Sequence, residues 1–329
     1  MSFYTQHLTG LGMDISEHHV RIAHMTVFGS VRKLIEVELP EGLVVDEKIV
    51  EAETVKEILH KRLKKEGFTG QQIRTTFLVP ESRVFATSFL FPESKKGPLW
   101  FHEAIDRAQQ DIPIPFDEAV AVVAQGAKNN GQIRTTVYAI EQDVFQGLQG
   151  IVDASEMKFT VMEANSKALL RLFQRYGKQD LQHHDPQTLI GLVDIGHSWA
   201  TISLYLPDGS NLFSRTLSYQ ANSSKTKDSS RLPQSTVDFI HRTIEEVVVY
   251  FKGQETKIGL FLFAGVEAED ERFKKDKLFY QMGDVVDVAG LNKKSIQTYG
   301  AALGAAIRSV HPYRYQRQHN FISGLELGQ

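Results

Sequence analysis

Two stretches of the chain, 180 residues apart, alternate apolar and polar positions in the same way. The stretch GMDISEHHVRIAHMTVFGS (12–30) aligns without gaps to LVDIGHSWATISLYLPDGS (192–210), and five of the 19 positions are identical. Average residue usage would give about one identity in such an alignment. A third strand-like segment follows each stretch, at 31–39 and at 211–219. Any two hairpins can share alternation and a glycine turn, but the identities favour a duplicated three-stranded meander.

A helix and then a buried strand are expected after each meander. Apolar residues recur every three or four positions over 49–70, and the β-branched run 73–80 follows. In the second half, the same order occurs as a helical pattern at 236–253 and an apolar run at 257–265. The chain is therefore predicted to be α/β, with two similar halves.

The segment between these halves, 82–160, has a pattern of its own. It contains strand-like or helical runs at 83–91, 98–112, 119–127 and 133–141. Because these runs interrupt the repeated order, they predict an inserted unit with a small sheet and one or two helices.

Two further helices are expected outside the insertion. Residues 159–177 are predicted to be helical throughout, and the polar stretch 178–187 then places the main boundary near residue 185. Near the end, 295–310 is a small-residue helix with Gly300 and Gly304 four positions apart. Such a face allows another element to pack closely against the helix.

Length and composition narrow the classes of protein. A chain of 329 residues with 42% apolar residues favours two domains with packed cores. The net charge is −3 with both signs interspersed, so no overall field attracts nucleic acid or anionic lipid. There is no cysteine, which excludes disulfides and thiolate chemistry. No segment has the length and hydropathy of a membrane span or signal peptide, so we expect a cytoplasmic protein.

The candidate chemistry centres on Asp14 and Asp194, which end the first strand of each meander. Such an aspartate can hold a hydrated Mg²⁺ while the turn beside it offers backbone N–H groups to phosphate. The second turn has Gly196, which permits close approach of a ligand, whereas the first has Ser16 and then the charged Glu17. Alternatively, both aspartates simply cap tight turns.

Other motifs carry less information. Ala264 and Gly265 follow a buried strand and could form a bed for a base or a ribose. The chain contains neither a P-loop nor a G-x-S-x-G elbow, and nothing marks a nucleophile or general base. The tail, 311–329, is basic and aromatic and then apolar; it is either a frayed terminus or a peptide that adds to a sheet edge.

Residues 8–310 resemble the actin/Hsp70/sugar-kinase superfamily and, within it, the type IV pilus assembly protein PilM family, related to FtsA. The motifs that carry this resemblance are 10–25 and 192–205 for the two phosphate loops, 102–120 for the inserted subdomain, and 159–173 and 299–308 for the connecting helices. The resemblance implies an actin-like fold: duplicated RNase H-like domains with mixed five-stranded sheets and flanking helices, and an inserted small α/β subdomain of the 1C type. The implied limits are 8–185 for the first domain with its insertion at about 82–157, 186–310 for the second with its last helix returning to the first, and 311–329 for the tail.

The resemblance also implies a site for ATP and Mg²⁺. Its residues would be Asp14, Ser16, Glu17, Asp194, Gly196, His197, Ser198, Ala264 and Gly265, with Asp14 and Asp194 holding Mg²⁺ through water. The chain departs from the family pattern at Ser16 and Glu17, lacks a glycine pair after Arg215, and has Ala-Gly-Val at the adenosine turn. We therefore expect ATP binding to be weak or lost, no catalytic residue is assigned, and enzymatic activity stays open.

As a member of this family, the chain would be a cytoplasmic scaffold of a type IV pilus or related secretion platform, comparable to the cytoplasmic domain of GspL. It would bind the N-terminal cytoplasmic peptide of a PilN-like inner-membrane protein in a groove involving the insertion. It would lie at the membrane through that partner only, with self-association left open. The alternatives are a small-molecule kinase and an FtsA-like filament former, although no terminal amphipathic helix is evident. The tail sequence NFISGLEL could mimic the partner peptide and occupy its groove in cis or in trans.

Overall fold

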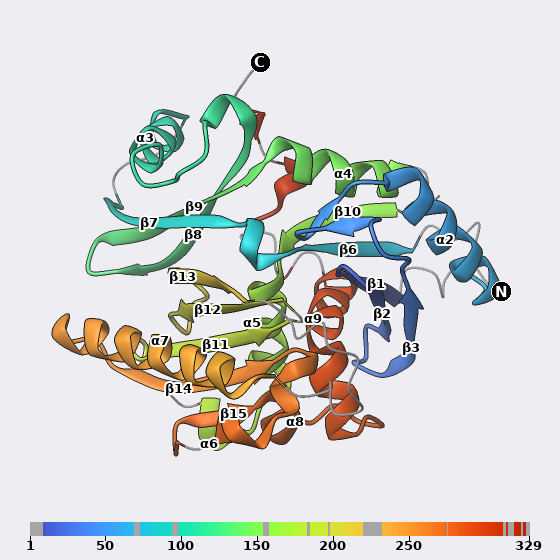
Figure 1. The fold of residues 1–329 in the computed structure, drawn as a ribbon. Helices are drawn as coiled ribbons and strands as arrows, with labels where there is room; N and C mark the ends of the chain where they lie inside the picture. The colour runs from blue at the N-terminus through green and yellow to red at the C-terminus, as the bar shows by residue number, and fades with distance from the viewer. Residues whose placement is uncertain are drawn as a thin grey trace.

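The computed structural model describes residues 9–68, 73–93, 98–153, 158–182, 185–196, 198–219, 232–274, 276–311, 314, 319–323 and 325–326. Within these residues the strands form two five-stranded sheets, a four-stranded sheet and a small ribbon of β4 (Val44–Val45) and β5 (Lys48–Ile49) (Figure 1).

The first five-stranded sheet has the order β10-β6-β1-β2-β3. Its strands are β1 (Thr9–Ile15), β2 (His19–Thr26), β3 (Val31–Glu38), β6 (Arg74–Val79) and β10 (Lys158–Ala164). The meander β1-β2-β3 is antiparallel, whereas β6 lies parallel to β1 and β10 parallel to β6. The sheet is therefore mixed, as predicted.

The second five-stranded sheet has the order β13-β12-β11-β14-β15, which corresponds to the first. Its strands are β11 (Leu189–Ile195), β12 (Trp199–Tyr205), β13 (Asn211–Ser218), β14 (Ile258–Ala264) and β15 (Phe279–Gln281). Again the meander is antiparallel and the two later strands are parallel to its first strand or to each other.

The duplicated meander is confirmed down to local geometry. β1 and β11 begin and end 180 residues apart, and so do β3 and β13. The turns after β2 and β12 each contain a glycine with φ of +86°, Gly29 and Gly209. The strand register also shifts at matching positions, after His24 in β2 and after Leu204 in β12.

The predicted helix over 159–177 is wrong in its first part, because Lys158–Ala164 is the strand β10. The apolar residues there do not alternate strictly, since Val161 and Met162 are adjacent. The strand follows from the backbone, which pairs with β6 at the edge of the first sheet with a shift of register between Phe159 and Val161. The helix α5 begins only at Asn165 and ends at Tyr176.

Helices cover the sheets in layers (Figure 1). α2 (Ala52–Lys65) and α4 (Gln142–Asp153) share a core with one face of the first sheet. α5 and α9 (Lys293–Val310) lie between the two five-stranded sheets, and α7 (Gln234–Gly253) covers the outer face of the second. The short elements are α6 (Gln179–Gln182), α8 (Met282–Val285), η1 (Glu81–Arg83), η2 (Phe116–Glu118), η3 (Val266–Glu269) and η4 (Glu271–Lys274).

Glycines allow α9 to approach its neighbours closely. A Cβ atom on Gly304 would lie 1.9 Å from the Ala168 carbonyl oxygen of α5, and one on Gly12 of β1 would lie 2.0 Å from the Ala302 carbonyl oxygen. No side chain fits at these distances, so the close packing predicted for the small-residue helix is confirmed.

The insertion forms the four-stranded sheet, ordered β16-β8-β9-β7, and α3 (Pro98–Ala108) packs on it. Its strands are β7 (Phe85–Pro92), β8 (Ala119–Asn129), β9 (Gln132–Glu141) and β16 (Leu325–Glu326). The tail supplies β16, so a frayed terminus is the wrong interpretation for its described residues.

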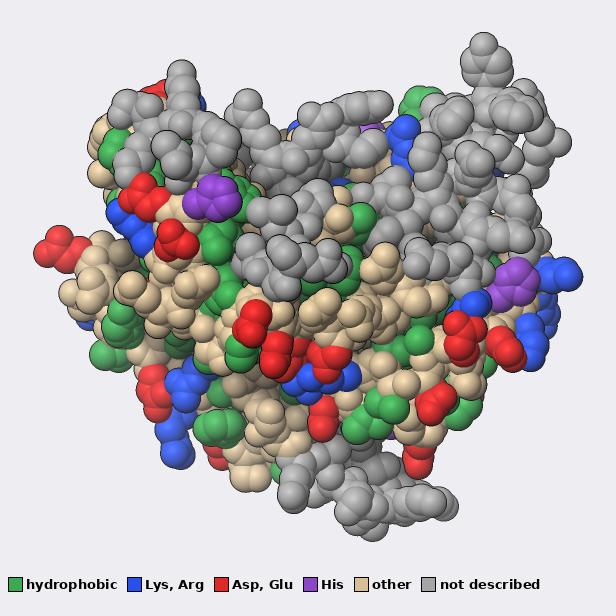
Figure 2. Space-filling model, turned by 90° about the horizontal axis from the view of Figure 1, so that it is seen from above, with side chains coloured by type: hydrophobic (Ala, Val, Ile, Leu, Met, Phe, Trp, Pro, Cys, Tyr) green, Lys and Arg blue, Asp and Glu red, His purple; other side chains and the backbone are tan. Residues whose placement is uncertain are grey.

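The surface agrees with the charge pattern of the sequence. On the face seen in Figure 2, acidic and basic side chains are scattered among polar and apolar ones. Among the helices that the structure describes, none combines the length and the hydropathy needed to cross a bilayer.

Candidate functional site

A cleft of about 160 Å³ lies where the two aspartate-bearing turns face each other. Six of the predicted site residues line it: Asp14, Ser16, Glu17, Asp194, Gly196 and Gly265. Ser198 and Ala264 are described but do not line the cleft, and His197 lies outside the described residues. The sequence thus predicted which turns come together.

The first turn is closed by hydrogen bonds of its own. The backbone N–H of Ser16 donates to the His19 carbonyl oxygen at 2.9 Å, and the Ser16 hydroxyl donates to the same oxygen at 3.0 Å. Neither group can donate to a phosphate unless the turn opens. The adjacent carboxylate of Glu17 lines the cleft and would repel phosphate oxygens.

The second turn has the same closure and is covered by an aromatic ring. The Gly196 N–H donates to the Trp199 carbonyl oxygen at 2.9 Å. A Cβ atom on Gly196 would lie 2.6 Å from Cε2 of the Trp199 indole, so the ring fills the space next to this glycine. The Tyr219 hydroxyl donates to the carbonyl oxygens of Gly196, at 2.6 Å, and of Trp199, at 2.9 Å, and so holds the turn shut.

Asp194 is buried and Asp14 is half-buried, and both are poorly suited to a cation. Burial, with the nearby Asp14 and Glu81 carboxyls, raises the pKa of Asp194 to about 8, and burial also raises the pKa of Asp14. Asn165 donates from Nδ2 to Asp194 Oδ2 at 2.6 Å. A metal ligand must be ionised, and no group of three or more acidic or histidine side chains is placed to hold a metal within the described part of the chain.

Glu47 is another acidic residue of the cleft, and its position there was not predicted from the sequence. It lies in the turn between β4 and β5 with φ of +61°, lines the cleft, and is only 7% exposed. Its Oε2 has no hydrogen-bond partner among the described residues. Burial and the nearby Asp194 carboxyl raise its pKa well above the usual value. The one signal was the polar run Asp46-Glu47-Lys48 between two apolar pairs, which indicates a tight turn but not its position beside the cleft.

The turn expected to hold a base or a ribose is tightly packed. Gly265 has φ of +94°, and a Cβ atom there would lie 2.2 Å from the Ile195 carbonyl oxygen. Gln297 of α9 donates from Nε2 to the Phe263 carbonyl oxygen at 3.0 Å and accepts from the Gly283 N–H at 3.0 Å. This side of the cleft is therefore fixed by the protein's own contacts.

The cleft does not fit Mg·ATP in this structure. Pockets for ligands of drug size are typically about 300–1,000 Å³, well above the volume of about 160 Å³ here. Among the residues that the structure describes, five acidic side chains line it, and Arg21 is the one Lys or Arg that does so; its Nε donates to Glu36 Oε1 at 3.1 Å. The acidic lining residues are Asp14, Glu17, Glu47, Asp194 and Glu267.

The model of a protein family described as type IV pilus assembly protein PilM matches residues 12–227, about two thirds of the chain. The chain belongs to this family. The family identified by the resemblance of its motifs is thereby confirmed. No curated protein sequence matches the chain.

Solved structures establish the fold of this PilM-family chain. A PilM-PilN type IV pilus biogenesis complex matches with a TM-score of 0.71 and 17% identity, over 92% of this chain and 98% of that one. A protein of unknown function with an actin-like ATPase fold, from Bacteroides thetaiotaomicron, matches with a TM-score of 0.50 and 11% identity, over the same shares. The cytoplasmic domain of EpsL, from the type II secretion system of Vibrio cholerae, covers 64% of this chain and 71% of that one at 11% identity and a TM-score of 0.41. The predicted actin-like fold is confirmed.

Proposed function

We propose that this PilM-family protein is a scaffold of a type IV pilus or related inner-membrane assembly platform, in which ATP binding is weak or lost. The observation that carries the proposal is the closure of both phosphate turns on themselves, next to Asp194, whose pKa burial and neighbouring carboxyls raise to about 8. A protein with such a cleft acts through its surface. Family membership and the similarity to a PilM-PilN complex indicate which kind of surface contact to test.

The partner in this proposal is a PilN-like inner-membrane protein, bound through its N-terminal cytoplasmic peptide in a groove that involves the insertion. The protein would then be cytoplasmic and held at the inner membrane by that partner. We also keep the domain limits inferred from the sequence as part of this proposal: 8–185 with the insertion, 186–310, and the tail.

The test is a titration of the full-length protein into a fluorescently labelled synthetic peptide with the N-terminal sequence of a PilN-like protein from the same organism. We expect saturable binding, and none to a scrambled peptide of the same composition. The titration is repeated with Mg·ATP, which should leave the affinity unchanged. Failure of the authentic peptide to bind, both to this protein and to a variant that lacks residues 312–329, would overturn the proposed partner. Turnover of ATP with a small-molecule acceptor would favour a kinase instead.

A further inference from the structure

The C-terminal segment of the chain lies between two sheet edges (Figure 1). One edge is β10 of the first sheet, and the other is β8 of the inserted sheet. η6 (Phe321–Ser323) contacts both strands, and β16 pairs antiparallel with β8, with Leu325 opposite Ala121 and Glu326 opposite Val120. We call the space between these two edges, occupied by residues 319–323 and 325–326, the slot.

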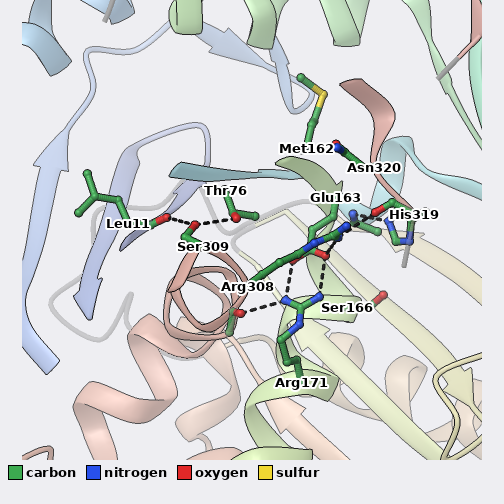
Figure 3. Close-up of polar contacts among 12 residues, drawn as sticks. Leu11, Thr76, Met162, Glu163, Ser166, Arg171, Arg308, Ser309, His319 and Asn320 are labelled. Atoms are coloured by element: carbon green, nitrogen blue, oxygen red, sulfur yellow. Dashed lines mark hydrogen bonds and ion pairs between the residues drawn. The ribbon is translucent and has the colours of Figure 1, made fainter. Parts of the chain in front are cut away.

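Side chains of the tail satisfy backbone donors at the edge of β10 (Figure 3). The Met162 N–H donates to Asn320 Oδ1 at 2.9 Å, and the Ala164 N–H donates to His319 Nε2 at 2.9 Å. Burial lowers the pKa of His319 well below its usual value, which keeps the ring neutral and Nε2 able to accept. Unsatisfied edge donors would be costly in a buried position, so the slot requires an occupant with acceptor groups.

The slot also contains an apolar socket, which Phe321 fills. This side chain is fully buried in the core that β8, β9 and β10 share with α2 and α4. The His319 ring stacks on Tyr138 at 4.0 Å between centroids and packs against Phe321 at 5.4 Å. Removal of the segment would expose a cavity about the size of a phenylalanine side chain.

The base of the slot is built by residues that precede the tail (Figure 3). Arg308 of α9 donates to the His319 carbonyl oxygen at 2.8 Å and is ion-paired with Glu163 of β10. Arg171 of α5 holds both oxygens of Glu163, at 2.6 and 2.7 Å. Burial raises the pKa of Glu163, but the two guanidinium groups outweigh it and bring the pKa down to about 2. This fixed cluster presents a donor to whatever backbone enters the slot.

We propose that the C-terminal segment of this chain occupies, in the slot, the groove that the proposed function assigns to the partner peptide, and that the segment competes with that peptide. The ligand class is an extended chain end with an Asn or Asp side chain next to a large apolar residue. This inference rests on the proposed function, whose partner supplies a free chain end. A free chain end can enter between two sheet edges, which a loop cannot do without threading.

The pairing of β16 leaves room for a better ligand. Only two residues pair in the described part of the tail, whereas β8 is 11 residues long. A peptide that pairs along more of this strand would gain backbone hydrogen bonds beyond those of Leu325 and Glu326. The tail compensates by being tethered, since a tether raises its effective concentration at the slot.

The test compares full-length variants for binding of the labelled N-terminal peptide of the PilN-like protein. Phe321→Ala weakens the hold of the tail but leaves the walls of the slot intact, so we expect at least a tenfold higher affinity for the peptide. Ile322→Ala is the matched control, because this neighbour is 37% exposed; its affinity should equal that of the unmodified protein. Deletion of 312–329 should match or exceed the gain of Phe321→Ala.

A disulfide clamp gives the opposite change in the same assay. The chain has no cysteine, so Ala121→Cys combined with Leu325→Cys can form a single bond between directly opposed residues. The oxidised protein should lose peptide binding and regain it on reduction. Saturable binding of equal affinity in every variant, or weaker binding by Phe321→Ala, would overturn the inference but leave the proposed function standing. Absence of binding in all variants, including the deletion, would overturn both.

Discussion

Burial changes the pKa of Asp194, a side chain that the sequence motif predicts to lie at a phosphate site. Its pKa rises to about 8 because the carboxyl is removed from water next to Asp14 and Glu81. The folded protein therefore binds this proton more tightly than the unfolded chain does. The contribution of Asp194 to the free energy of unfolding falls as the pH rises from about 4 toward 8.

Asp194→Asn should consequently stabilise the protein at pH 8 and have little effect at pH 4. The amide keeps an oxygen for Asn165 and carries no charge. Since one unit of pKa shift corresponds to about 1.4 kcal/mol, a gain of at least about 1 kcal/mol is expected at pH 8. Urea unfolding at the two pH values measures it, with Asp180→Asn at an exposed position of α6 as the control. Destabilisation by Asp194→Asn at pH 8 would show that the charge is needed.

The residues that the sequence did not reveal reach the cleft from other elements. Asp14 and Asp194 could be paired because a constant offset relates their strands. Glu47 comes from the β4–β5 turn, and Asn165 from the first residue of α5. Trp199 occupies the place of an ordinary polar position in the first meander, His19. No periodicity or spacing connects Glu47 or Asn165 to the aspartates, so only the folded chain brings these two side chains to the cleft.

At the scale of elements, the packing of α9 depends more on Gly304 than on Gly300. Gly304→Ala places a methyl group against the backbone of α5, where the Ala168 carbonyl oxygen would be 1.9 Å away. Gly300→Ala meets only the flexible end of Leu169, at 3.3 Å. We expect Gly304→Ala to destabilise the protein by about 2 kcal/mol, as overpacking does. Gly300→Ala should be near neutral, because improved helix propensity of about 1 kcal/mol offsets the tight contact.

Chemical denaturation of the two alanine variants measures these effects, and equal effects would contradict the close crossing of α5 and α9.

The helix α9 was predictable from sequence because its small residues recur four apart. β10 was not, because Phe159–Ala164 and α5 are joined without a break by residues that suit either conformation. Pairing with β6 decides the strand, and such non-local pairing leaves little trace in a local pattern.

For the whole molecule, the closed cleft predicts how the protein responds to nucleotide. A ligand that binds the folded state raises its stability in proportion to the logarithm of its concentration over Kd. We therefore expect no saturable heat in calorimetric titrations of Mg·ATP or Mg·ADP, and no rise in Tm at millimolar nucleotide. Asp194→Ala serves as the comparison. If the unmodified protein binds nucleotide and Asp194→Ala does not, both turns must be able to open. The closed turns of this structure would then be one of two states.

The fold of the whole molecule could be predicted from the sequence because its main feature, the three-stranded meander, occurs twice with matching residues at a constant offset. The position of the tail could not be predicted, since the apolar residues of NFISGLEL do not indicate which strand they pair with. Both edges that receive it, β8 and β10, are themselves defined by pairing between distant parts of the chain.

The position of α9 also has a consequence for synthesis on the ribosome. Ser309 donates to the Leu11 carbonyl oxygen at 2.7 Å and accepts from the Thr76 hydroxyl at 2.7 Å, so the start of the chain is tied to its last helix (Figure 3). β1 leaves the ribosome nearly 300 residues before this contact can form. Contacts so distant along the chain slow folding, and during translation one face of the first sheet stays uncovered. The sheet that is made first is therefore the one whose core is completed last.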